Sequence, residues 1–209
     1  MIPIAGRPFL EWQLRYLAGQ GIRRFVISLG YLAEVAQAYF AARAPDHLEI
    51  RTVVERAPLG TGGAVVYADS EAAGDPLLIA NADSLAAAAL GPAFERFKRP
   101  ETDAVILGVR VADASRFGTL ALDAEGRLLG FAEKRPGQGI INAGVYLIRR
   151  SVVGRFPAKR PLSLETEVFP RLLAEGAVIY GAPVEAPFLD IGTPESLGEA
   201  EEFLLRNFA

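Results

Sequence analysis

Short apolar runs alternate with helical stretches along the first half of the chain, and this alternation constrains the fold more than any other feature of the sequence. The apolar runs are typical of buried strands and lie at 25–29, 48–54, 76–80 and 104–111. The helical stretches lie at 9–18, 33–44, 61–68 and through Leu90 to Phe97. This order predicts an α/β fold, with a Rossmann-like, mostly parallel but mixed sheet that has helices on both faces. Ligands of such sheets bind beyond the carboxyl ends of the strands.

The pattern changes after Arg116. An inserted β-hairpin is expected there, from segments at 117–122 and 127–132 joined by a turn at 123–126. The elements expected beyond it are a long strand at 140–148, a helix at 164–174, short strands at 177–182 and 187–191, and a closing helix at 194–208. Pro170 should kink or split the helix that contains it. No linker divides the chain, so we expect a single domain over 1–209.

Composition excludes several classes of function. The chain has 209 residues, of which 51% are hydrophobic, and a net charge of −3, so no basic excess indicates nucleic acid or a membrane surface. It has no cysteine, which excludes disulfides, thiolate metal sites and Cys nucleophiles and favours a cytoplasmic location. The single histidine, His47, is expected in a loop, which disfavours a His triad or a zinc site. No apolar run has the length of a membrane span, and the first residues do not resemble a signal peptide.

The segment Glu55–Ala64 is rich in glycine and joins a predicted strand to a predicted helix. Three of its glycines, Gly60, Gly62 and Gly63, fall within four residues and would let another molecule approach the backbone closely. The helix start would offer free N–H groups to an anion or a hydrogen-bonding ring. A tight strand-to-helix turn with no ligand is an equally good interpretation.

Two aspartates, Asp83 and Asp190, each follow a short apolar strand. A carboxylate in that place can hold Mg²⁺, which prefers a few carboxylates together with phosphate oxygens and water. If the two side chains converge, they form a cation site. If they do not, both are turn or cap residues.

Polar residues near the hairpin are candidates for contacts with a phosphorylated sugar. Lys134 could neutralise a phosphate, and Glu133 could accept hydrogen bonds from sugar hydroxyls; the alternative is an exposed ion pair. Asn142 lies inside an otherwise apolar strand, so its amide needs a partner if it is buried. A sugar hydroxyl or a neighbouring backbone group would serve.

Taken in order, six segments resemble the successive signatures of the sugar-phosphate nucleotidyltransferases. They are Glu55–Ala64, Asn81–Ser84, Phe117–Thr119, Phe131–Lys134, Asn142–Tyr146 and Asp190–Glu195. The resemblance covers essentially the whole chain, and the ordered set is far more specific than any one segment. Within the family, Gly6–Trp12 and Ser28–Tyr31 are most similar to bacterial D-glycero-D-manno-heptose 1-phosphate guanylyltransferases. Related thymidylyl-, uridylyl- and mannose-type enzymes share most of the six signatures.

The resemblance implies that an oxygen of a sugar 1-phosphate attacks the α-phosphorus of a nucleoside triphosphate, which gives an NDP-sugar such as GDP-heptose and releases pyrophosphate. It implies Mg²⁺ held by Asp83 and Asp190, with these two residues and Lys134 as the catalytic set. The nucleotide-binding residues that it implies are Glu55, Leu59, Gly60 and Thr61. The sugar-phosphate-binding residues that it implies are Gly118, Glu133, Lys134, Asn142, Gly144 and Glu165.

The sequence departs from the family pattern in two places. The family's Asn-Gly-Asp is here Asn81-Ala82-Asp83, and alanine would be strained if that position needs a positive φ. The family also begins with a strand and a G-G-x-G-T-R-L loop, whereas this sequence begins just after them. On this resemblance we expect a break in the hydrogen-bond ladder of the sheet, an incomplete sequence, and little or no transferase activity for the chain as given.

Three other functions stay open at this stage: a non-catalytic sugar-nucleotide-binding or regulatory homologue, a dinucleotide-binding Rossmann enzyme, and a metal-dependent glycosyltransferase. The sequence Gly60-Thr61-Gly62-Gly63 does not match the dinucleotide pattern G-x-G-x-x-G. A glycosyltransferase would release no pyrophosphate. The sequence does not determine the base, the sugar or the oligomeric state, and it leaves a homo-oligomer open.

Overall fold

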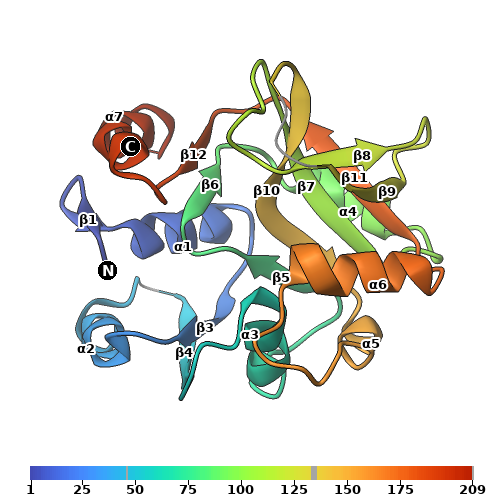
Figure 1. Ribbon diagram of the computed structural model, residues 1–209. Helices are drawn as coiled ribbons and strands as arrows, with labels where there is room; N and C mark the ends of the chain where they lie inside the picture. The colour runs from blue at the N-terminus through green and yellow to red at the C-terminus, as the bar shows by residue number, and fades with distance from the viewer. Residues whose placement is uncertain (46, 133–135, 209) are drawn as a thin grey trace.

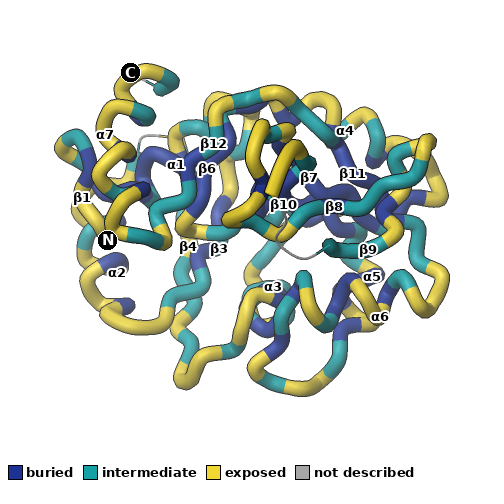
Figure 2. The backbone as a smooth tube through the Cα atoms, turned by 45° about the horizontal axis from the view of Figure 1, so that its top comes forward, coloured by how far each residue is buried: buried dark blue, intermediate teal, exposed yellow. Residues whose placement is uncertain are grey.

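A six-stranded sheet occupies the middle of the protein (Figure 1), in a computed structural model that describes residues 1–45, 47–132 and 136–208. Its strands are β5 (Leu77–Ala80), β7 (Ala104–Val111), β8 (Thr119–Leu122), β9 (Leu128–Ala132), β10 (Gly139–Ile148) and β11 (Ile179–Val184). The order is β11-β7-β10-β8-β9, and β5 also pairs with β10. The long apolar strands β7 and β10 are buried along most of their length, as Figure 2 shows.

One edge of β10 pairs with two strands in succession, β8 and β5. Its residues 145–148 pair with β5, and Ile141 pairs with Thr119 of β8. Between these pairings lie residues 142–144, where the register with β7 on the other edge also shifts. Register shifts of this kind re-aim side chains and are common beside active sites. The sheet therefore splits at the point where β5 ends and β8 begins.

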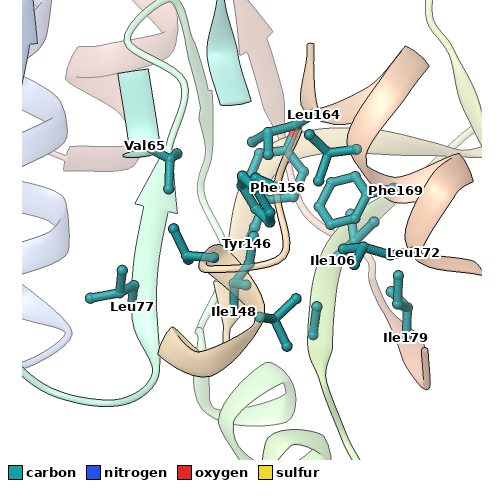
Figure 3. Packing of buried hydrophobic residues seen from close by; sticks show 14 of the residues in the cluster. Val65, Leu77, Ile106, Tyr146, Ile148, Phe156, Leu164, Phe169, Leu172 and Ile179 are labelled. Atoms are coloured by element: carbon teal, nitrogen blue, oxygen red, sulfur yellow. The ribbon is translucent and has the colours of Figure 1, made fainter. Parts of the chain in front are cut away.

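Helices cover both faces of the sheet because β7 and β10 alternate their apolar side chains between the faces. On one face, Ile106, Tyr146 and Ile148 pack with α3 (Thr61–Ala68), α5 (Arg150–Val153), the π-helical turn η1 (Leu164–Val168) and α6 (Phe169–Ala174), as Figure 3 shows for part of the cluster. On the other face, Leu107 and Leu147 pack in clusters that include α1 (Phe9–Gly19), α2 (Ala33–Arg43) and α4 (Gly91–Phe97). The closing helix α7 (Pro194–Phe208) packs on α1.

Three pairs of short strands complete the fold. They are β1 (Pro3–Ile4) with β2 (Arg7–Pro8), β3 (Arg24–Leu29) with β4 (Glu49–Val54), and β6 (Ser84–Ala86) with β12 (Phe188–Asp190). Only the β3–β4 pair is parallel. No ladder between described residues joins it to the central sheet, which agrees with the interruption expected from the sequence. None of the described helices combines the length and the apolar character that crossing a membrane requires.

The α/β class, the mixed sheet and the inserted hairpin are confirmed. Parallel pairing is rarer than expected: among the described residues, two strand pairs are parallel and six are antiparallel. Three of the antiparallel pairs involve β10, because the chain returns from the hairpin into β10 and runs antiparallel to β5, β7 and β8. Pro170 splits its helix as predicted, with η1 before it and α6 around it. The short strands β1, β2 and β6 and the short helix α5 were not expected.

Candidate active site

A cavity of about 1360 Å³ opens where β5 and β8 separate along β10. Its polar lining residues are Thr61, Asn81, Asp83, Ser84, Arg116, Asn142, Glu165, Thr166 and Asp190. Its apolar lining residues are Phe117, Leu129, Phe131, Ala132, Pro170, Leu173, Ala174 and Phe188, and its glycines are Gly118, Gly130 and Gly144. The polar residues come from the segment after β5, from β6 (Ser84–Ala86) and β12 (Phe188–Asp190), from β10 and η1, from the start of α3, and from the segment between β7 and β8. The sequence predicted that ligands bind beyond the carboxyl ends of the strands, and this cavity lies beyond the carboxyl end of β5.

Asp83 and Asp190 meet in this cavity because β6 and β12 pair. Asp190 lies opposite Ser84 in the ladder, and the Ile191 N–H donates to the carbonyl oxygen of Asp83 at 2.8 Å. Partial burial raises the pKa of Asp83, and the negative charges of Asp190 and Glu165 raise it further. The charges of Asp190 and Glu165 therefore both act on Asp83 inside a single cavity.

The loop that carries Asp83 is fixed from two sides. The Gln13 side chain, buried in α1, donates to the carbonyl oxygens of Asn81 at 2.7 Å and Ser84 at 2.6 Å. The Asn81 N–H donates to the carbonyl oxygen of Gly144 at 2.8 Å. Ala82 has no positive φ, so the strain expected from alanine at this position is not present. Gln13 was not singled out in the sequence, although an amide on an apolar helix face signals a specific buried partner.

Gly144 allows β10 to approach this loop. Its φ is +70°, and a Cβ atom there would lie 2.8 Å from Ser84 Oγ and 2.9 Å from Asn81 Nδ2. Only glycine adopts this backbone conformation without strain and leaves room for the two side chains. Gly118 also lines the cavity, but a Cβ there would meet nothing within 4 Å.

The amide of the half-buried Asn142 has protein partners. Its Oδ1 accepts from the Gly144 N–H at 3.0 Å, and its Nδ2 donates to Tyr146 Oη at 2.9 Å. Tyr146 Oη in turn donates to Glu165 Oε1 at 2.7 Å. The other carboxylate oxygen of Glu165 accepts from Ser163 Oγ at 2.9 Å and Thr61 Oγ1 at 3.2 Å. The sequence analysis expected a neighbouring backbone group as one possible partner of Asn142, and the Gly144 N–H is that partner. The contact with the Tyr146 hydroxyl was not expected.

The glycine-rich loop is a tight turn braced by a distant segment. The N–H groups of Gly62 and Gly63 donate to the carbonyl oxygen of Leu162 at 2.8 and 3.3 Å. The expectation that these N–H groups are free for an anion is therefore wrong, because the loop before η1 already satisfies them. Gly60 has a φ of +73°, and a Cβ there would lie 2.6 Å from the Leu162 carbonyl oxygen.

The predicted nucleotide-binding residues do not all reach the cavity. Of Glu55, Leu59, Gly60 and Thr61, only Thr61 lines it. The Glu55 carboxylate accepts from Ser28 Oγ at 2.7 Å and from the Leu59 N–H at 3.0 Å. Glu55 thus holds the start of the loop in place. Whether these residues bind a nucleotide stays a prediction.

Two of the predicted sugar-phosphate residues, Glu133 and Lys134, lie outside the described residues. Arg116, by contrast, was not singled out and lines the cavity. Its Nη2 donates to Thr193 Oγ1 at 3.3 Å, and its guanidinium carbon lies 5.7 Å from the centroid of the Phe117 ring. It thus brings a positive charge to the cavity that contains Asp83 and Asp190.

Comparison with known proteins identifies the family. The family model described as nucleotidyl transferase matches residues 1–207. The chain belongs to the nucleotidyl transferase family. The resemblance found in the sequence is therefore confirmed, and the cavity with its acidic side chains lies in the part of the chain that the family model matches.

Two relatives within the nucleotidyl transferase family are named for sugar 1-phosphates. The mannose-1-phosphate guanylyltransferase of Mycobacterium tuberculosis is 36% identical over 212 residues, which cover all of this chain and 59% of that protein. The D-glycero-α-D-manno-heptose 1-phosphate guanylyltransferase of Aneurinibacillus thermoaerophilus is 30% identical over 205 residues, or 98% of this chain and 88% of that protein. The chain thus spans less than two thirds of the first and most of the second.

Solved structures confirm the fold of the family. HddC from Yersinia pseudotuberculosis, described as complexed with GMP-PN, has a TM-score of 0.88 and 30% identity over 97% of this chain and 88% of that chain. The inositol-1-phosphate CTP transferase from T. maritima has a TM-score of 0.80 over 98% of this chain and 85% of that chain, at 15% identity. The second likeness shows the fold alone.

Proposed function

We propose that this protein transfers a nucleotidyl group from a nucleoside triphosphate to a sugar 1-phosphate, giving an NDP-sugar and pyrophosphate. The observation that carries the proposal is the meeting of Asp83 and Asp190 in one polar cavity of a nucleotidyl transferase fold. The names of the relatives with substantial identity support it. In such a reaction, catalysis consists of positioning two phosphorylated substrates and neutralising their charge.

We propose Mg²⁺ as the cofactor, with Asp83 and Asp190 as its protein ligands. The donor set fits, because two carboxylates face one cavity, where burial and then the charge of Asp190 raise the pKa of Asp83. The described residues contain no cluster of three or more His, Cys, Asp or Glu side chains suited to a metal, so phosphate oxygens and water would supply the other ligands. When bound, the ion would neutralise charge on the reacting phosphates.

The remaining residues of the cavity have separate tasks in this proposal. Asn142 and Glu165 would present their amide and carboxylate groups to the sugar hydroxyls. Gly144, which has no side chain, lets β10 lie close to the segment that carries Asp83. Gly118 belongs to the same pocket. On the family resemblance, we retain Glu133 as a sugar ligand and Lys134 as the phosphate ligand and catalytic cation.

The nucleotide side is proposed to use the loop Glu55–Thr61. Glu55 positions the loop through its bonds to Ser28 and Leu59, and Leu59 and Gly60 would contact the base. Thr61 faces the cavity, next to the proposed reaction centre. We propose GTP as the nucleotide, because both named relatives are guanylyltransferases, and a heptose or mannose 1-phosphate as the sugar.

The proposed reaction is soluble small-molecule chemistry, so we place the protein in the cytoplasm. The absence of cysteine in the sequence agrees with that location. The single-domain organisation over 1–209 and a homo-oligomeric state stay predictions. No nucleic acid or membrane takes part in the proposed reaction.

A matrix of pyrophosphate-release assays tests the function. The protein, as the cell makes it, is supplied with Mg²⁺, each of the four nucleoside triphosphates in turn, and a set of hexose and heptose 1-phosphates. We expect release with GTP and one of the mannose-type sugars. Binding of nucleotide and sugar phosphate without release would indicate a non-catalytic homologue. Consumption of an NDP-sugar without pyrophosphate release would indicate a glycosyltransferase.

Arg116 gives a prediction that the sequence alone did not. If its charge faces a substrate phosphate, Arg116→Ala should lower kcat/KM by about tenfold or more, because a charge-assisted hydrogen bond is lost. Arg116→Lys should recover only part of the loss, since lysine cannot form the planar two-point contact of a guanidinium. Steady-state kinetics measure both effects.

Arg171→Ala is the matched control, because Arg171 is an exposed arginine whose partner is Glu175 on the same helix end. Kinetics of Arg116→Ala that equal those of this control would remove Arg116 from the site.

A further inference from the structure

Tyr146 connects the two sides of the cavity and has no part in the function proposed above. It lies in β10 with no exposed surface. Its ring packs among Phe156, Leu164 and Phe169 (Figure 3), with 5.4 Å between its centroid and that of Phe169. Only its hydroxyl is polar, and a buried hydroxyl needs hydrogen-bond partners. Two of those partners are Asn142 and Glu165, which both line the cavity, and Asn81 is a third.

The local backbone explains why the tyrosine reaches both partners. Asn142 pairs with Gly108 of β7, whereas Tyr146, four positions later, pairs with Ile106. The β10 strand therefore carries two extra residues in this stretch, including Gly144 at a φ of +70°. The resulting bulge brings the side chains of Asn142 and Tyr146 within 2.9 Å of each other.

The donor and acceptor of each hydrogen bond around Tyr146 are determined by the chemistry of the groups involved. The Gly144 N–H can only donate, so the atom it meets must be Oδ1 of Asn142, and Nδ2 must face the tyrosine. The single hydroxyl proton of Tyr146 is then free to go to Glu165, whose ionised carboxylate can only accept. Burial, together with the charge of Glu165, keeps the pKa of Tyr146 well above its ordinary value, so the proton stays in place. Each bond thus dictates the orientation of the next.

The same carboxylate extends the chain to the nucleotide side. Glu165 Oε2 accepts from Thr61 Oγ1 at 3.2 Å, and Thr61 is the first residue of α3, directly after the glycine-rich loop. Thr61 Oγ1 also accepts from the Leu164 N–H at 2.8 Å. Glu165 is therefore the junction between β10 and the start of α3.

We infer that Tyr146 is a positioning residue: together with the Gly144 N–H it holds the Asn142 amide in one orientation, and it holds the Glu165 carboxylate, so that both side chains select a polyhydroxylated sugar phosphate. The inference rests on the proposed function for the identity of the ligand. Tyr146 touches no substrate itself. Its hydroxyl holds the Asn142 amide and the Glu165 carboxylate in fixed orientations before the sugar binds.

Tyr146→Phe tests this inference, because it removes the hydroxyl and keeps the ring packing. We expect KM for the sugar 1-phosphate to rise about tenfold or more, while KM for the nucleoside triphosphate and kcat at saturation change by less than about threefold. Direct calorimetric titration with the sugar 1-phosphate should show the same loss of affinity. Glu165→Gln should raise the same KM, and the double variant should lose less than the product of the two single effects, since both disrupt one chain of bonds.

Tyr180→Phe is the matched control. Tyr180 is equally buried, and its hydroxyl accepts from Arg127 Nε at 3.4 Å, in a smaller cavity away from the candidate active site. The KM values of this variant should be unchanged, because the Tyr180 hydroxyl contacts no described residue of the candidate active site. Equal sugar KM in the Tyr146→Phe and Tyr180→Phe variants of an active enzyme would overturn the inference. A wild-type protein that binds no sugar 1-phosphate would instead overturn the proposed function.

Discussion

Asp83→Asn is expected to reduce nucleotidyl transfer by about a thousandfold or more while leaving the folded protein at least as stable as wild type. The activity is lost because one of two proposed magnesium ligands loses its charge, and electrostatic stabilisation is usually the largest catalytic contribution. Such a trade of stability for activity is common at active sites. Pyrophosphate release and thermal unfolding measure the two effects.

The stability effect follows from the direction of the pKa shift. The pKa of Asp83 is raised in the folded state, so between the unfolded pKa and the folded pKa the folded protein binds the proton more tightly. Stability therefore falls as the pH rises through this window, and the ionised carboxylate opposes folding above it. Asparagine has no such charge. The variant's melting temperature should equal that of wild type at low pH and match or exceed it at neutral pH.

Asp123→Asn provides the control for this prediction. Asp123 Oδ1 accepts from the N–H groups of Glu125 and Arg127 in the hairpin turn, outside the candidate active site, and asparagine keeps an acceptor oxygen there. Added Mg²⁺ should raise the melting temperature of this control and of wild type more than that of the Asp83→Asn variant. Retention of more than about a tenth of the activity by Asp83→Asn would contradict the proposed role.

Gly144→Ala is expected to destabilise the fold by about 2–5 kcal/mol and to lower activity with it. The left-handed backbone costs a non-glycine residue about 1–2 kcal/mol, and overpacking costs about 1–3 kcal/mol. The added Cβ would lie 2.8 Å from Ser84 Oγ and 2.9 Å from Asn81 Nδ2. Both residues belong to the loop that carries Asp83, so the steric clash displaces the carboxylate. Denaturant unfolding and pyrophosphate release measure the two losses.

Gly118→Ala separates this effect from a general sensitivity of the cavity. Gly118 lines the same cavity, but its φ is not positive and a Cβ there meets nothing within 4 Å. Its free energy of unfolding should change by less than about 1 kcal/mol. Equal stability of the Gly144→Ala and Gly118→Ala variants would mean that the β10 bulge tolerates side chains.

Local patterns in the sequence were enough to predict most of the helices and strands. The run at 104–111 was found because seven of its eight residues are apolar or small, and it forms the strand β7 with the predicted bounds, in which Arg110 is exposed. The strand β6 was missed because Ser84-Leu85-Ala86 is short and precedes an alanine-rich stretch. Its extended form depends on pairing with β12, about a hundred residues later, and no local pattern reports such a partner.

Most of the predicted residues that line the cavity came from the ordered resemblance to the family, among them Thr61, Asn142 and Glu165. The local pattern placed Asp83 and Asp190 after short apolar strands but left them open as turn or cap residues, and only the ordered resemblance to the family singled them out as metal ligands. The glycine-rich loop was expected to offer free N–H groups, but Leu162 occupies two of them, and its approach depends on tertiary packing. Gln13, Arg116 and Tyr146 were missed for the same reason, since each reaches the site from a distant segment or across a bulge.

The central claim is that Asp83 and Asp190 together hold one divalent cation, and anomalous scattering from crystals grown with Mn²⁺, GTP and a sugar 1-phosphate tests it most directly. The proposed function predicts an Mn²⁺ peak at coordination distance, about 2.0–2.6 Å, from a carboxylate oxygen of each aspartate. It also predicts that the peak disappears in the Asp190→Asn variant. An Mn²⁺ peak that contacts neither aspartate, or one that persists unchanged in that variant, would contradict the claim.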